Sequence, residues 1–183
     1  ILYLEWLLTF RQGFPMSTIF DRSEGVVLSS EPEEVSPETL AQLKSGANWF
    51  YWIAGLSLIN SAIFVFGGNV NFIAGLAFTQ IVDAIFDASV SQGAPGGIMA
   101  VAVVIDVIVV VVFALIGYFS NKAMNAVFIG GMVIYAIDGV IWLLLGSLFA
   151  AGFHVFALVM IFRGFMASRE VNRIKTENKA LRA

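Results

Sequence analysis

Ionisable side chains interrupt long apolar runs in this sequence, where hydrocarbon rather than water is the expected surrounding. They are four aspartates and the single histidine: Asp83, Asp87, Asp106, Asp138 and His154. A charged side chain at the centre of a membrane-spanning helix costs about 2.5 to 3.5 kcal/mol on insertion scales unless a proton, a cation or a partner compensates it. These five residues are therefore the candidates for chemistry.

Three kinds of chemistry fit such a set. Carboxyl groups in apolar surroundings can bind and release protons or alkali cations during transport. Oxygen and nitrogen ligands from several helices can hold a divalent metal, and the candidate ligands are Asp83, Asp106, Asp138 and His154. Such a metal, or an acid and base pair, could catalyse a reaction on a membrane-embedded substrate. The competing interpretation is structural, because polar side chains also hydrogen-bond between helices without doing chemistry.

The spacing of neighbouring polar residues predicts which of them share a helix face. Residues three and four apart lie on one face of a helix. This spacing groups Gln80 with Asp83 and Asp87, Tyr135 with Asp138 and Trp142, and Ser57 with Asn60 and Ser61. We expect Asn60, Gln80 and Tyr135 to support the ionisable residues, with Asn60 deep enough to reach Gln80 from a neighbouring helix.

The composition indicates a membrane protein. Of the 183 residues, 59% are hydrophobic and 13% are charged, whereas about 25% of residues are charged in a soluble domain. There are no cysteines, which excludes disulfides and thiolate metal ligands. Continuous apolar runs without alternation favour helices over a membrane barrel.

We predict an all-α, polytopic bundle of five membrane-spanning helices. Each span is long enough for about 30 Å of hydrocarbon. The spans are placed at residues 48–67, 71–90, 97–119, 124–145 and 147–167. The connections between them are short, so consecutive helices are expected to be antiparallel neighbours.

These spans bring the ionisable residues to one layer. Counted from the nearer helix end at 1.5 Å per residue, Asp83, Asp138 and His154 lie about 10 Å deep and Asp106 about 14 Å deep. Asp87 lies nearer the surface, about 5 Å deep. The sequence therefore predicts one polar layer, to which four helices each contribute an ionisable group.

The regions outside the spans have different characters. Residues 1–47 are expected to hold a short interfacial helix at 1–10 and an acidic flexible segment from 21 to 35. A short helix then starts at Ser36, with Pro37 and Glu38 in its first turn, and ends at Ser45 and Gly46. Residues 168–183 form a basic tail helix with an apolar stripe, suited to lie on headgroups or to pair with another subunit.

Charge predicts the orientation. Residues 1–47 hold three basic and seven acidic side chains, whereas residues 163–183 hold six basic and two acidic ones. Five spans and the preference of basic residues for the cytoplasm put the C-terminus in the cytoplasm and the N-terminus on the other side.

The leading functional hypothesis is a site for protons or cations, in transport or a channel-like role. The alternative is a non-enzymatic accessory subunit of a larger membrane complex, and the third is a metal-dependent intramembrane enzyme. The partners expected are the lipid bilayer and either further copies of the chain or other subunits, but no nucleic acid. No Walker, Rossmann, HExxH or GxSxG pattern is present, so the sequence predicts no nucleotide cofactor and assigns no catalytic residue.

Overall fold

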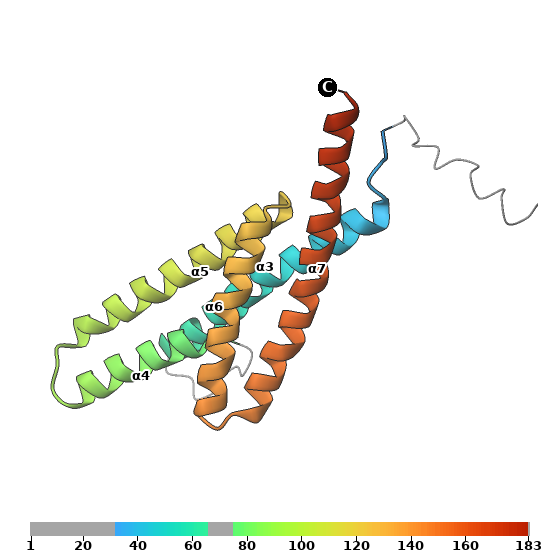
Figure 1. Cartoon of the computed structure of the whole chain (residues 1–183). Helices are drawn as coiled ribbons and strands as arrows, with labels where there is room; N and C mark the ends of the chain where they lie inside the picture. The colour runs from blue at the N-terminus through green and yellow to red at the C-terminus, as the bar shows by residue number, and fades with distance from the viewer. Residues whose placement is uncertain (1–31, 66–74, 183) are drawn as a thin grey trace, which may run out of the picture.

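The computed structural model describes residues 32–65 and 75–182, and this part of the chain is helical without strands. The elements are α3 (Pro37–Val65), α4 (Ala77–Ser91), the 3-10 turn η2 (Gly96–Ile98), α5 (Met99–Asn121), α6 (Asn125–Leu144) and α7 (Leu148–Leu181). In Figure 1, α4 with α5 and α6 with α7 form two hairpins, and α3 runs past both of them. The all-α prediction is confirmed for the described residues.

Within residues 32–65 and 75–182, three helices are long and apolar enough to cross a membrane: Gly96–Asn121, Asn125–Leu144 and Leu148–Leu181. They coincide with the last three predicted spans and fit a location in a membrane. Residues 48–65 of the first predicted span, 48–67, lie within α3, which is not among these three although it has 29 residues. Residues 66 and 67 lie outside the described residues.

The second predicted span, 71–90, is not one helix of that length. Residues 71–74 lie outside the described residues, and α4 begins only at Ala77. With 15 residues, α4 is about 22 Å long, which is short of the roughly 30 Å of hydrocarbon in a bilayer. A five-span bundle is therefore not confirmed.

The start of α3 follows the predicted capping pattern, but its early end was wrong. The Ser36 hydroxyl accepts a hydrogen bond from the Thr39 amide at 3.1 Å, and Glu38 lies in the first turn. The helix does not stop at Ser45 and Gly46, because it continues without a break to Val65. The proposed boundary at residue 47 therefore falls inside one helix.

Gly46 is instead the point where α3 crosses α7. A Cβ atom added to Gly164 would lie 2.5 Å from the Cα atom of Gly46, so the two backbones are in direct contact. Small residues let two helices approach this closely. The glycine that looked like a helix break in the sequence therefore serves helix packing.

The core lies where α3 packs against α5 and α7, with α6 packed against α7. Aromatic rings fill it: Phe50 on α3 contacts Phe113 on α5 and Phe128 on α6, with ring centroids 6.5 and 6.1 Å apart. All three side chains are buried. This core joins the two hairpins through α3.

The basic tail is continuous with the last apolar helix. At 34 residues α7 is about 51 Å long, so it extends well beyond a bilayer's hydrocarbon. The apolar stripe predicted for residues 168–183 packs within the chain, because Val171 is buried against Leu43 and Ala123. Ile174 is also buried.

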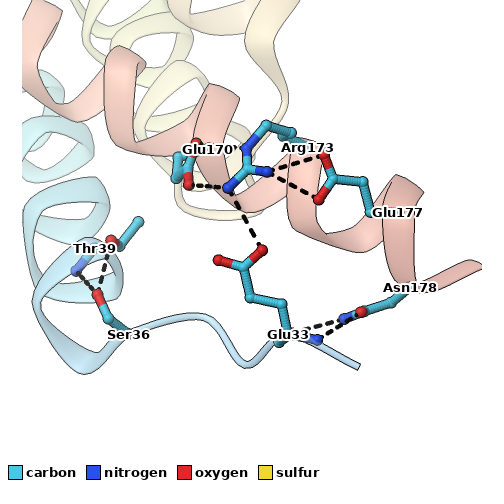
Figure 2. Close-up of polar contacts among 7 residues, drawn as sticks. All are labelled: Glu33, Ser36, Thr39, Glu170, Arg173, Glu177 and Asn178. Atoms are coloured by element: carbon cyan, nitrogen blue, oxygen red, sulfur yellow. Dashed lines mark hydrogen bonds and ion pairs between the residues drawn. The ribbon is translucent and has the colours of Figure 1, made fainter. Parts of the chain in front are cut away.

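Polar contacts join the tail to the segment before α3 (Figure 2). The Glu33 amide donates to Asn178 Oδ1 at 2.9 Å, and Asn178 Nδ2 donates to the Glu33 carbonyl at 2.8 Å. Arg173 pairs with Glu170 at 2.6 Å, with Glu177 at 2.9 Å and with Glu33 at 3.6 Å. Hydrogen bonds from Arg173 lower the pKa of the Glu170 carboxyl below its ordinary value.

These contacts join two regions that were predicted on opposite sides of the membrane. Residues before 48 were expected on the opposite side from the tail, whereas Glu33 is hydrogen-bonded to Asn178 near the end of α7. The predicted orientation counted α4 as a full crossing, and α4 is shorter than the hydrocarbon of a bilayer. The orientation of the two ends stays a prediction. The helix predicted at 1–10 and most of the acidic segment at 21–35 lie outside the described residues.

The close approach of α3 and α7 gives a first testable prediction. Gly164→Ala should lower the free energy of unfolding by about 1 to 3 kcal/mol, because the added methyl group meets the backbone of Gly46. The matched control is Gly152→Ala on the same helix, where nothing lies within 4 Å of the added Cβ atom. That substitution should be neutral or stabilise the helix by up to about 1 kcal/mol. Thermal unfolding in detergent measures both, and equal effects would contradict the crossing.

Candidate functional site

The first turn of α4 lies in the interior of the protein. Leu76, Ala77 and Thr79 are fully or almost fully buried. The first amide groups of any helix lack partners within the helix, and burying them without a partner costs roughly 1 to 3 kcal/mol each. No side chain at the cap position supplies these bonds, so they must come from other helices.

Asp138 on α6 supplies two of them. Its Oδ2 atom accepts a hydrogen bond from the Ala77 amide at 2.8 Å, and its Oδ1 atom accepts one from the Phe78 amide at 3.0 Å. The positive end of the helix dipole also favours a carboxylate at this position. Ser57 on α3 accepts from the Leu76 amide at 3.2 Å. The start of α4 is thereby fixed between α3 and α6.

Trp142 completes this contact one turn further along α6. As the spacing predicted, it shares a face with Asp138, and its indole nitrogen donates to the Gly75 carbonyl at 3.2 Å. Asn60 lies on the other side, with its side-chain amide against Gly75. Side chains of α3 and α6 therefore form hydrogen bonds with three backbone amides and with one backbone carbonyl group at the start of α4.

His154 on α7 pairs with the same carboxylate. Its Nε2 atom lies 2.9 Å from Asp138 Oδ2, and its Nδ1 atom lies 2.8 Å from the Ala150 carbonyl oxygen. A carbonyl oxygen only accepts, so Nδ1 carries the hydrogen of the bond to Ala150, and Nε2 shares a hydrogen bond with Asp138 Oδ2. His154 is thereby tied to the same carboxyl group that binds the start of α4.

Packing holds the histidine ring in place. The ring stacks on Tyr135 with centroids 4.3 Å apart and an angle of 18°. On α6, Gly139 leaves the space that the ring needs, because a Cβ atom there would lie 2.9 Å from His154 Cβ. The Tyr135 hydroxyl finds no hydrogen-bond partner within the described part of the chain. Tyr135 therefore supports His154 through its ring.

A second carboxyl group pair lies between α4 and α5. The carboxyl groups of Asp83 and Asp106 are neighbours and interact electrostatically. The Ser61 hydroxyl on α3 donates to Asp106 Oδ2 at 2.6 Å, and all three side chains are buried. Asp106 Oδ1 finds no further donor among the described residues. Since a carboxylate oxygen cannot donate, a hydrogen bond between these two groups requires a proton on one of them.

In the structure these residues form two separate sets and not one group. Asp138 binds the first residues of α4, whereas Asp83 lies six residues after Ala77, about 9 Å further along the helix. The proposed ligands Asp83, Asp106, Asp138 and His154 do not form one set: within the described residues, no group of three or more such side chains could hold a metal ion.

The remaining candidates lie around these two sets. Asp87 is exposed, one turn beyond Asp83. Asn60 is buried and Gln80 is half-buried, and both make polar contacts in the protein. The sequence did not single out the hydroxyl groups of Ser57 and Ser61 as site residues, although both belonged to a predicted polar stripe.

Comparisons with models of protein families, with curated proteins and with solved structures find no match for this chain. Its class thus follows from its own features. The part of the chain that the structure describes is helical, with three helices able to cross a membrane and two buried sets of ionisable side chains.

The role of Asp138 can be tested by one isosteric change. Asp138→Asn replaces one acceptor oxygen by a donor group, which must then face a donor of α4 or of His154. We expect the free energy of unfolding to fall by about 2 to 3 kcal/mol. Asp87→Asn, on an exposed position, should change it by less than about 0.5 kcal/mol. Equal thermal stability of the two variants in detergent would show that Asp138 does not anchor α4.

Proposed function

We propose that this protein is a multi-pass membrane protein that binds and moves protons at the site formed by Asp83, Asp106 and Ser61. The observation that carries the proposal is the contact between two buried carboxyl groups, one of which has an oxygen without a donor. Two ionised carboxylates in contact repel each other. A proton between them removes the repulsion and supplies the missing donor, and an alkali cation could take its place.

The other ionisable pair is less suited to this role. Asp138 already accepts hydrogen bonds from two backbone amides and pairs with His154. Removing its charge would leave those donors unsatisfied in the interior. We therefore assign Asp138 and His154 to anchoring α4 and assign proton exchange to Asp83 and Asp106.

Asp87 offers a route between this site and water. It is exposed and lies four residues after Asp83, on the same face of α4 and about 6 Å nearer the end of the helix. Gln92 and Gly93, in the turn that follows, are exposed as well. Protons would thus enter from the side of the membrane that holds the α4 to α5 turn.

The same proposal includes a topology. The helices α3, α5, α6 and α7 cross the bilayer, and α4 enters it only part of the way. The turn holding Lys122 is then on the same side as the tail, because Asn172 Nδ2 donates to the Ala123 carbonyl at 2.7 Å. Basic residues prefer the cytoplasm, so this side is cytoplasmic and includes Glu33.

A second candidate function is that of an accessory subunit. It is favoured by the set around Asp138, where the polar side chains serve the packing of α4 rather than a ligand. Purification in mild detergent distinguishes the two functions, because a stoichiometric partner chain, or a second copy, would favour the accessory role. A metal-dependent enzyme has the least support, since the described residues hold no metal-binding group of three.

Proton movement gives the next prediction. In vesicles that contain the purified protein and a pH-sensitive dye, a potassium diffusion potential should drive proton uptake. Asp83→Asn and Asp106→Asn should each reduce the rate at least tenfold, because the amide group cannot exchange a proton at the site. Ser61→Ala, which removes one hydrogen bond to Asp106, should reduce it less.

A spectroscopic measurement detects the protonated carboxyl group itself, whether or not protons move across the membrane. Infrared spectra of the folded protein should contain a carbonyl band of a protonated carboxyl group, which shifts in heavy water. Asp83→Asn and Asp106→Asn should each remove the band, and the matched control Asp87→Asn should keep it. If wild-type vesicles show no proton flux, the protein does not transport protons. If the wild-type spectrum lacks the band, Asp83 and Asp106 do not share a proton.

The topology can be tested in a chain that has no native cysteine. Single cysteines at Glu34 and Lys175 should react with an impermeant thiol reagent from one side of the membrane. A cysteine at Gln92 should react only from the other side. Reaction of positions 34 and 175 from opposite sides would contradict both the topology and the contact between Glu33 and Asn178.

A further inference from the structure

A cavity of about 260 Å³ lies where the start of α4 meets the middle of α5 and α6. Its volume is close to the lower end of the range for small-molecule sites, about 300 Å³. It is lined by ten residues, of which nine are apolar. The exception is Asp138, whose oxygens are already bonded to the start of α4 and to His154. The cavity therefore offers contact to an apolar occupant.

The cavity opens sideways onto the apolar surface of two helices able to cross a membrane. Among the residues that line it, Ile108 is 56% exposed, Val112 41% and Ile137 58%. Ile108 and Val112 are on α5, and Ile137 is on α6. The side of the cavity is thus formed by side chains that would face the bilayer.

Its depth identifies the occupant. Ile108 lies nine residues after the start of α5 at Met99, and Ile137 lies seven residues before the end of α6 at Leu144. Both positions are about 10 to 14 Å from a helix end, near the middle of about 30 Å of hydrocarbon. A phospholipid headgroup stays at the interface, so the part of a phospholipid that reaches this depth is the methyl-end half of an acyl chain.

We propose that this cavity is a binding site for the acyl chain of a membrane phospholipid, which packs against the buried start of α4. Leu76 and Phe78 line the cavity and flank Ala77, the first residue of α4. The bound chain fills the space beside the Asp138 contact and stabilises the position of α4. The inference depends on the location in a membrane and not on proton movement.

The test compares two neighbouring valines on α5. Val112 lines the cavity, whereas Val111 is similarly exposed and does not. The probe is dioleoyl phosphatidylcholine, added in steps to protein that was purified in detergent and stripped of lipid. The thermal unfolding temperature of wild type and of Val111→Trp should rise with the lipid. Val112→Trp, which fills the cavity, should lose this rise.

A second pair of variants and a probe without acyl chains complete the test. Ile137→Trp and Val133→Trp form a second pair on α6, in which only Ile137 lines the cavity, in case Val112→Trp does not fold. Glycerophosphocholine, which has the headgroup but no chains, should leave the unfolding temperature unchanged. An unchanged lipid response in both cavity variants, or a full response to glycerophosphocholine, would overturn the proposal.

Discussion

The buried start of α4 is the constraint on which the rest of the arrangement depends. Its first amides lie away from water, and Asp138 and Ser57 provide the acceptors they need. Those acceptors belong to α6 and α3, so the requirement of one short helix fixes three helices relative to each other. His154 then joins α7 to the same carboxyl group. The Asp138 carboxyl group therefore connects α4, α6 and α7, and the Ser57 hydroxyl adds α3.

This arrangement gives the two sets of buried acids different properties. Asp138 has partners for both oxygens, which are two backbone amides at a helix terminus and the ring of His154. Asp83 and Asp106 have each other and one serine hydroxyl. In the proposed function, a proton or a cation between these two carboxyl groups removes their mutual repulsion. Fixing α4 at its first turn is also what places Asp83 against α5, because both positions lie on one rigid helix.

Much of this could be predicted from the sequence, and the failures have physical causes. Residues 97–119, 124–145 and 147–167 are apolar for long enough that helices able to span a membrane follow, and Ser36 carries a recognisable cap. The start of α4 could not be predicted, because its acceptor Asp138 lies 61 residues away from Ala77. In the same way, the sequence around Gly46 predicts a helix end, because its contact with Gly164 on α7 cannot be seen in the sequence. Helix periodicity put Asp83 and Asp87 on one face of a helix, but it could not predict that only Asp83 of the two is buried, or which acids would meet.

The most direct test of this account is the hydrogen exchange of the Ala77 and Phe78 amides, measured by NMR in detergent micelles. In the wild-type protein both amides should exchange slowly, since each donates to a buried carboxylate. Asp138→Asn should accelerate exchange at both amides by at least about tenfold, which corresponds to 1.4 kcal/mol, whereas Asp87→Asn should leave both rates unchanged. If Ala77 and Phe78 exchange rapidly in the wild type, or if Asp138→Asn has no effect, α4 is not held by Asp138 and the account is wrong.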